Sequence, residues 1–421
     1  MDGSTLVVIS AVFLCHASIS RRLNGTSLTA PIVFVGAGFL FGAQGLGWLD
    51  VTMDHHAVSV LAEATLTVVL FTDASRINLH ALRRQYSVPA RLLGIGLPLT
   101  IVAGSIAGAL ILPGVTWAES AVLAIVLAPT DAALGQAVVT DPDLPSRIRQ
   151  GLNVESGLND GLCVPLLTIA LAVAQTEAHD MSGGDAVRLV GEAIGWGVVG
   201  GVVAGGSAAY VLRTARARGW MEAHWAQVVP VVGAAGSFGI ADARGGSGFI
   251  AAFVGGVVFG LVVDEDATPA EFAEELGGVL NGLTLIVFGA AVLGTLWSDI
   301  DIAEVGYAVL SLTVVRMVPV ALAMLGSGAR APTVWFLGWF GPRGLASIVF
   351  GVVVLEAGGL PHTPTLVAAL TATVAMSVVA HGITAAPLVR RYVSWHAALT
   401  PPMESTLVPE QRWRHAAASS H

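Results

Sequence analysis

The sequence contains no lysine, so every fixed positive charge comes from arginine. Charged residues of all kinds make up only 12% of its 421 residues, whereas a soluble domain has about a quarter. This shortage of charge excludes an ordinary soluble globular protein. The formal net charge of -9 adds little, because orientation in a membrane depends on where the basic residues lie.

Other features are also scarce or missing. The only cysteines, Cys15 and Cys163, lie in apolar segments, so the sequence predicts no disulfide framework. There is no Walker-type phosphate loop, which argues against ATP-driven transport. No basic segment precedes the first apolar stretch, so we interpret that stretch as a membrane span and not as a signal peptide. We expect membrane lipids as surroundings and no ATP, nucleic acid or cofactor as partners.

Long apolar runs are abundant. Hydrophobic residues make up 54% of the chain, and the mean hydropathy is +0.76. A run of roughly 18 apolar residues can cross a hydrocarbon core of about 30 Å as a helix. We therefore predict an all-α polytopic membrane protein with about thirteen transmembrane helices. The predicted spans lie near 4–20, 28–47, 57–75, 88–112, 116–139, 148–175, 187–212, 222–242, 246–263, 270–297, 302–325, 332–356 and 364–389.

The loop arginines fall on one side of the membrane if this count holds. They are Arg21, Arg22, Arg76, Arg83, Arg84, Arg91, Arg147, Arg213, Arg216, Arg218, Arg330, Arg390 and Arg391. Basic loops face the cytoplasm, which predicts an N-terminus outside and a cytoplasmic C-terminus. The acidic loop 264–275 also falls on the cytoplasmic side, but acidic residues weigh little in this rule. Residues 394–421 are expected to form a short cytoplasmic tail.

Two predicted spans are interrupted near their centres. Span 5 contains Pro129, Thr130 and Asp131, and span 12 contains GPRG at 341–344. Paired interruptions at corresponding places indicate a transporter built from two inverted repeats of six helices, with crossing broken helices. A broken helix leaves partly positive N-terminal ends and partly negative C-terminal ends inside the membrane. Asp131 suits the positive ends, and the arginine of GPRG, Arg343, suits the negative ends.

Span 6 carries the polar segment NVESGLNDG at 153–161. Ser156 and Asp160 share one helix face, as do Glu155 and Asn159. With Thr130 and carbonyls freed by the break, the first face forms an all-oxygen cluster of the kind that hard cations prefer. Asp160 can hold a cation or a proton, and competition between them would couple two opposing flows. The Glu155/Asn159 face is expected to pair with Arg343.

Three further residues are singled out by their charge or titration. Arg316 is expected in a buried ion pair, with Asp131 or Glu63 as partner. His381 is interpreted as a hydrogen-bonded interior histidine more readily than as a proton relay. His362, at the outer end of a span, is expected to be solvated.

Two other functions are weighed. An intramembrane serine hydrolase could use Ser247 of GGSGF with His381, but it leaves both broken helices and span 6 unexplained. A channel could use backbone carbonyls, but a buried titratable carboxylate fits a carrier better. An oxygen cluster suits Na⁺, Li⁺ or K⁺ with small changes of size, so the cation stays open.

The motifs APTDAAL (128–134), NVESGLNDG and FGPRGLAS (340–347) resemble the cation:proton antiporter family of the NhaP proteins and the eukaryotic sodium/proton exchangers. The resemblance covers the membrane part, 1–393. It implies a core domain (in part near 57–175 and 270–389) and a dimerisation domain (in part near 4–47 and 187–263). It further implies a homodimer with elevator-type alternating access.

The resemblance also assigns roles to individual residues. Asp160 resembles the aspartate that binds the cation and the proton, and Thr130 and Ser156 its hydroxyl ligands. Asn159, Glu155 and Arg343 resemble a structural triad. Asp73 stands where the family usually has glutamate. Asn159 before Asp160 resembles the electroneutral branch, so the prediction is a 1:1 sodium/proton antiporter, with potassium/proton antiport as the alternative. The arginine-only composition, rich in alanine, glycine and valine, suggests a bacterial inner membrane.

Overall fold

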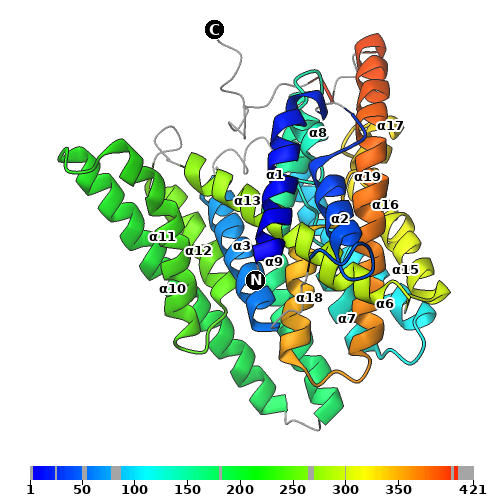
Figure 1. The fold of residues 1–421 in the computed structure, drawn as a ribbon, viewed down its shortest axis with the longest axis horizontal. Helices are drawn as coiled ribbons and strands as arrows, with labels where there is room; N and C mark the ends of the chain where they lie inside the picture. Colours follow the sequence, from blue (N-terminus) through cyan, green and yellow to red (C-terminus); the bar gives the residue numbers. More distant parts are fainter. Residues whose placement is uncertain are drawn as a thin grey trace. The chain divides into compact units, whose positions relative to one another are not determined.

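The computed structural model describes residues 3–23, 26–49, 55–76, 87–179, 183–263, 270–298, 300–399 and 403–405. In its first part, the helices are α1 (Gly3–Leu23), α2 (Ala30–Phe41), α3 (His55–Ser75), α5 (Ser87–Arg91), the π-turn η1 (Leu92–Gly96), α6 (Leu97–Ile111), α7 (Trp117–Val126), α8 (Gln136–Val139) and α9 (Ser146–His179) (Figure 1).

The later helices are α10 (Gly183–Ala217), α11 (Ala223–Asp242), α12 (Gly248–Val262), α13 (Glu271–Val287), the π-turn η3 (Phe288–Leu293), α14 (Gly294–Leu296), α15 (Ile302–Leu312), α16 (Val314–Ala323), α17 (Ala331–Trp339), α18 (Leu345–Ala357) and α19 (Thr363–Leu399). Within the described ranges, eight helices are long and apolar enough to cross a membrane, and α2, α7, α12 and α18 are shorter apolar helices. The predicted all-α polytopic fold is confirmed, while the count of thirteen spans and the inverted repeat stay predictions.

The helices group into two compact units. Among the described residues, the first contains those of Met1–Ala62, Ser87–Ser156 and Asn281–Val408, and the second contains those of Glu63–Tyr86 and Gly157–Leu280. The boundaries fall inside α3, α9 and α13, so each of these helices contributes to both units. The expected core and dimerisation domains stay a prediction.

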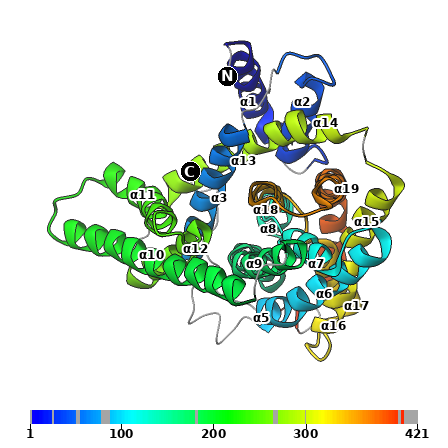
Figure 2. The ribbon, with the colours of Figure 1, turned by 90° about the horizontal axis from the view of Figure 1, so that it is seen from below.

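In the second unit, α10, α11 and α12 lie side by side (Figure 2). Glycines on α10 make this approach close: a Cβ at Gly205 would overlap the backbone of Gly255 on α12, and one at Gly200 would meet Ala241 on α11. Small residues let membrane helices pack backbone to backbone, where dispersion and weak polar contacts replace the hydrophobic effect as the driving force.

In the first unit, glycines bring α2 against α13 and η3, because a Cβ at Gly38 would overlap the Ile286 carbonyl. Helices α7, α18 and α19 pack together around the predicted breaks (Figure 2). An apolar cluster joins the start of α9 to α16, α17 and α19. Its members include Ile148, Leu152, Val320, Phe336, Val389, Tyr392 and Met403.

The predicted interruptions are present. Span 5 is divided between Val126 and Gln136, and span 12 between Trp339 and Leu345. Helix α19 continues to Leu399, so its last residues lie in the range 394–421 that we expected to form the tail. Tyr392 packs on Trp395 with ring centroids 5.3 Å apart, and this apolar contact stabilises the last part of the helix.

The contact of Gly205 with Gly255 leads to a stability prediction. Gly205→Ala should lower the Tm of the detergent-purified protein, because overpacking typically costs about 1–3 kcal/mol. Gly195→Ala on the same helix is the matched control, since a Cβ there would meet no atom within 4 Å. Equal Tm values for the two variants in thermal unfolding would contradict this packing.

Candidate functional site

The two interrupted spans meet at their breaks. The backbone N–H of Asp131 donates to the carbonyl of Pro342 at 2.8 Å, so the PTD segment and the GPRG segment contact each other directly. Pro129 and Pro342 lack backbone donors, which favours an interruption of the helix at each place. The breaks thus form one joint in the first unit.

Asp131 caps the second half of span 12. Its Oδ2 accepts a hydrogen bond from the N–H of Leu345, the first residue of α18, at 2.9 Å. Its Oδ1 accepts from the N–H groups of Ala133 (2.7 Å) and Leu134 (3.3 Å). A carboxylate is stabilised at a helix N-terminus, where backbone N–H groups and the helix dipole face it. The expected placement of Asp131 at a positive helix end is confirmed.

Arg343 makes the reciprocal contact. Its Nη1 donates to the carbonyls of Ala128 (3.2 Å) and Pro129 (3.4 Å), just past the end of α7. The same nitrogen donates to the carbonyl of Gly341 at 3.1 Å, and the side chain is fully buried. The guanidinium therefore lies at a negative helix end, also as expected. Span 5 supplies the anion for span 12, and span 12 supplies the cation for span 5.

Two glycines make room for this joint. A Cβ at Gly344 would overlap the Asp131 carboxylate, and a Cβ at Gly341 would lie 2.6 Å from Nε of Arg316. The glycines of GPRG thus allow charged side chains to approach the backbone closely.

Arg316 forms the expected buried ion pair, but with a different partner. Its Nη1 lies 2.6 Å from Oε1 of Glu155 on α9, and each side chain is only 2% exposed. Our expectation that Arg316 pairs with Asp131 or Glu63 was wrong, because Asp131 instead accepts backbone N–H groups of the breaks. The expected pairing of the Glu155/Asn159 face with Arg343 stays a prediction.

The two predicted hydroxyl ligands are brought together. Oγ1 of Thr130, in the break of span 5, lies 3.0 Å from Oγ of Ser156 on α9, and both side chains are buried. Asp160 follows Ser156 by one turn of the same continuous helix, so the two share a face. Asn159 and Asp160 are also buried.

Asp73 lies on α3, half-buried, against the polar segment of α9. A Cβ placed on Gly157 would be 3.7 Å from the Cβ of Asp73. Gly157 falls between Ser156 and Asp160 in the motif. Asp73, which is shorter than the glutamate usual in the family, therefore lies beside the polar segment of α9.

The residues of the hydrolase alternative have structural roles. His381 is 1% exposed, and its ring nitrogens bond to Ser377 and to the carbonyl of Trp339, the last residue of α17. The hydroxyl of Ser247 caps the start of α12 by accepting from the N–H of Ile250. His381 is therefore the hydrogen-bonded interior histidine that we expected.

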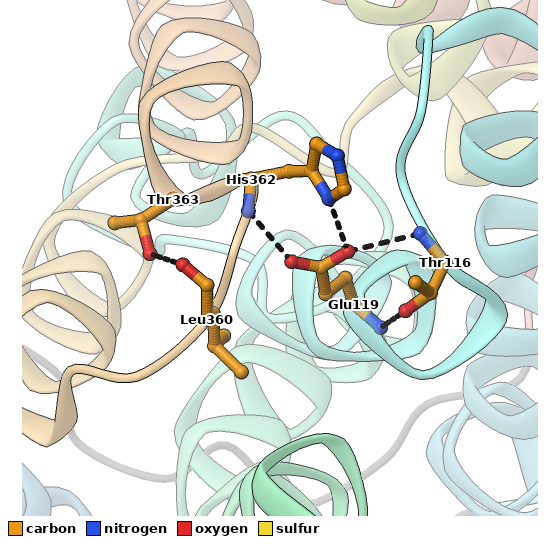
Figure 3. Close-up of polar contacts among 5 residues, drawn as sticks. All are labelled: Thr116, Glu119, Leu360, His362 and Thr363. Atoms are coloured by element: carbon orange, nitrogen blue, oxygen red, sulfur yellow. Dashed lines mark hydrogen bonds and ion pairs between the residues drawn. The ribbon is translucent and has the colours of Figure 1, made fainter. Parts of the chain in front are cut away.

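Sequence reasoning missed one polar cluster, at the start of α7 (Figure 3). Thr116 and Glu119 form a capping box, and Glu119 also accepts from the backbone N–H of His362 at 2.9 Å. The ring Nδ1 of His362 lies 2.9 Å from Glu119 Oε2, so His362 is not simply solvated. The Thr-x-x-Glu spacing before an apolar run is the signal that could have predicted the cap.

Comparison with known proteins places the chain in a family. The family model described as "Sodium/hydrogen exchanger, transmembrane" matches residues 8–391. The chain therefore belongs to the sodium/hydrogen exchanger family, as its three motifs indicated. This membership confirms the family that the motifs predicted and agrees with the multi-pass membrane fold described above.

The chain is similar to curated relatives named K(+)/H(+) antiporter NhaP2. The protein of Shewanella oneidensis is 22% identical over 363 residues, covering 83% of this chain and 60% of the relative. That of Shewanella sp. (strain MR-4) is 21% identical over 359 residues with the same coverage. The chain thus spans about three fifths of the length of these relatives.

Among solved structures, the chain is similar to the sodium proton antiporter MjNhaP1 from Methanocaldococcus jannaschii. The structure at pH 8 has a TM-score of 0.68 and 15% identity, and covers 93% of this chain and 98% of the other. A second structure of the same protein gives a TM-score of 0.66, again at 15% identity. At this identity the likeness concerns the fold.

The ion pair leads to a prediction about stability. Glu155→Gln should destabilise the protein by about 3–5 kcal/mol, because it leaves the Arg316 charge buried without its counter-ion. The double variant Glu155→Gln with Arg316→Gln should recover much of the loss, since neither charge then remains. Thermal unfolding of the purified proteins measures both.

The exposed pair Arg188–Glu192 on α10 is the matched control for this measurement. Glu192→Gln should leave the Tm unchanged, because solvent screens exposed ion pairs. Additive effects of the two single substitutions at 155 and 316 would contradict the proposed coupling.

Proposed function

We propose that this chain exchanges a monovalent cation for protons, with Na⁺ as the cation. The observation that carries the proposal is the Thr130–Ser156 hydroxyl pair, buried at 3.0 Å where the two broken helices meet. Asp160 lies one turn further along the helix that carries Ser156. Membership of the sodium/hydrogen exchanger family supports the same activity.

The proposed chemistry uses oxygen ligands only. Two hydroxyls, the Asp160 carboxylate and main-chain carbonyls of the break would replace part of the hydration shell of a small hard cation. Asp160 binds either the cation or a proton, so binding of one ion releases the other. Exchange at one carboxylate is then sufficient to couple cation movement in one direction to proton movement in the other.

The joint of the broken helices gives this site a fixed electrostatic frame. Asp131 and Arg343 are held by backbone groups, and Glu155 neutralises Arg316. The charges nearest to the breaks are therefore already compensated within the protein. In this proposal Asp160 changes its charge during transport, while Asp131, Glu155 and Arg343 support the site and Asp73 assists beside α9.

Potassium is the second candidate for the transported cation. The relatives named above carry K⁺/H⁺ antiporter in their names, whereas the structural relative is a sodium proton antiporter. Both ions accept oxygen ligands, and small differences in site size decide between them.

Further parts of the proposal follow from the family resemblance. They are 1:1 electroneutral exchange, elevator-type alternating access and a homodimer. The electroneutral exchange is supported by Asn159, which stands in place of a second acidic residue. The arginine pattern supports a cytoplasmic C-terminus, and the bacterial relatives support an inner membrane location.

A transport assay tests the activity. In proteoliposomes with an imposed pH gradient, addition of Na⁺, Li⁺ or K⁺ should dissipate the gradient, and the order of rates identifies the cation. Asp160→Asn should abolish this exchange, because the amide cannot take up and release the proton. If no monovalent cation dissipates the gradient, the function is wrong; if Asp160→Asn remains active, the site is wrong.

Competition at Asp160 predicts a definite pH dependence. Lower pH should raise the apparent KM for the cation, by up to about tenfold per unit where protons occupy the site, with little change in the maximal rate. Ser156→Ala should raise the KM at every pH because it removes one ligand. Ser18→Ala on α1, whose exposed hydroxyl donates to the Cys15 carbonyl, serves as control. A KM independent of pH would contradict competition.

A further inference from the structure

The two half-helices that lead into the breaks, α7 and α17, begin differently. Each needs partners for its first backbone N–H groups. Helix α7 carries its own carboxylate, Glu119, in a capping box. Helix α17 begins after Arg330, which makes no side-chain cap, and has no acidic residue in its first turn.

A residue from the end of the chain fills this role for α17. Oε1 of Glu404 accepts hydrogen bonds from the backbone N–H of Arg330 at 3.0 Å and from Oγ1 of Thr333 at 2.6 Å. Thr333 Oγ1 also lies 2.9 Å from the hydroxyl of Tyr392 on α19. Glu404 is 1% exposed, which is unusual for a glutamate without a specific partner.

The segment Met403–Ser405 is held on both sides of Glu404. The carbonyl of Met403 accepts from Nη1 of Arg147 on α9 at 3.2 Å, and its side chain belongs to the apolar cluster of α16, α17 and α19. Oγ of Ser405 lies 3.2 Å from Nε2 of His396 on α19. These contacts fix the carboxylate at the start of α17.

We infer that Glu404 is a positioning residue for transport, acting as the N-terminal cap of α17. A carboxylate at this end satisfies a free N–H group and complements the helix dipole. Helix α17 has nine residues, a rod of about 14 Å, and its other end leads into Gly341 and Arg343. A shift at its start therefore moves the joint of the broken helices. The inference rests on the proposed function for its effect on transport.

Hydrogen exchange tests the cap by itself. Glu404→Ala should increase amide exchange in the first turn of α17 by about fivefold, the effect of losing a helix cap. Glu404→Gln keeps an acceptor oxygen and should show a smaller increase. The first turn of α7, capped by Glu119, is the internal reference and should not change. If Glu404→Ala shows the same amide exchange at α17 as the wild-type protein, the assignment of the cap is overturned.

Transport in proteoliposomes tests the positioning role. Well below its Tm, Glu404→Ala should raise the apparent cation KM roughly threefold or more, because the site loses its geometry. Glu404→Gln should lie between this variant and wild type, a graded rescue that a purely structural role would not give. Glu356→Ala, at an exposed glutamate near the end of α18, is the matched control and should be unchanged.

The outcomes separate the two proposals. A wild-type KM and maximal rate in Glu404→Ala would overturn the positioning role, even with faster exchange at α17. Absence of cation-dependent proton movement in the wild-type protein would overturn the proposed function, while hydrogen exchange would still decide whether Glu404 caps α17.

Discussion

The reciprocal capping of the two broken helices is the constraint on which the first unit depends. Interrupting a helix inside a membrane exposes N–H and carbonyl groups that lipid cannot satisfy. Asp131 accepts from the first N–H group of α18, and Arg343 donates to carbonyls just past the end of α7. Each break is stabilised in part by a charged side chain of the other. The two segments must therefore fold together.

This constraint explains the arrangement of charge around the site. Asp131 and Arg343 bind backbone groups, and Arg316 pairs with Glu155, which ties α16 to α9. Glycines at 341 and 344 allow these side chains to lie against the backbone. The proposed cation ligands Thr130 and Ser156 are neutral hydroxyls that lie next to these compensated charges.

The other ends of the half-helices are also held by side chains that bind their backbone groups. Glu119 holds the start of α7 and reaches the loop before α19, while Glu404 reaches the start of α17 from the other end of α19. His381 bonds to the last carbonyl of α17. The contacts of Glu119 with His362, of Glu404 with Arg330 and of His381 with Trp339 each join segments distant in sequence, so tertiary contacts help to orient the short helices α7 and α17.

The sequence by itself determined the apolar helices, the two breaks and the charged residues beside them, because hydropathy, proline and glycine act locally. It also determined that Ser156 and Asp160 share a face, which follows from helix period alone. Only the tertiary structure decided that Glu155 pairs with Arg316, that His362 meets Glu119, and that Glu404 caps α17. These choices depend on which side chains distant segments bring together, and they are settled only when those segments pack.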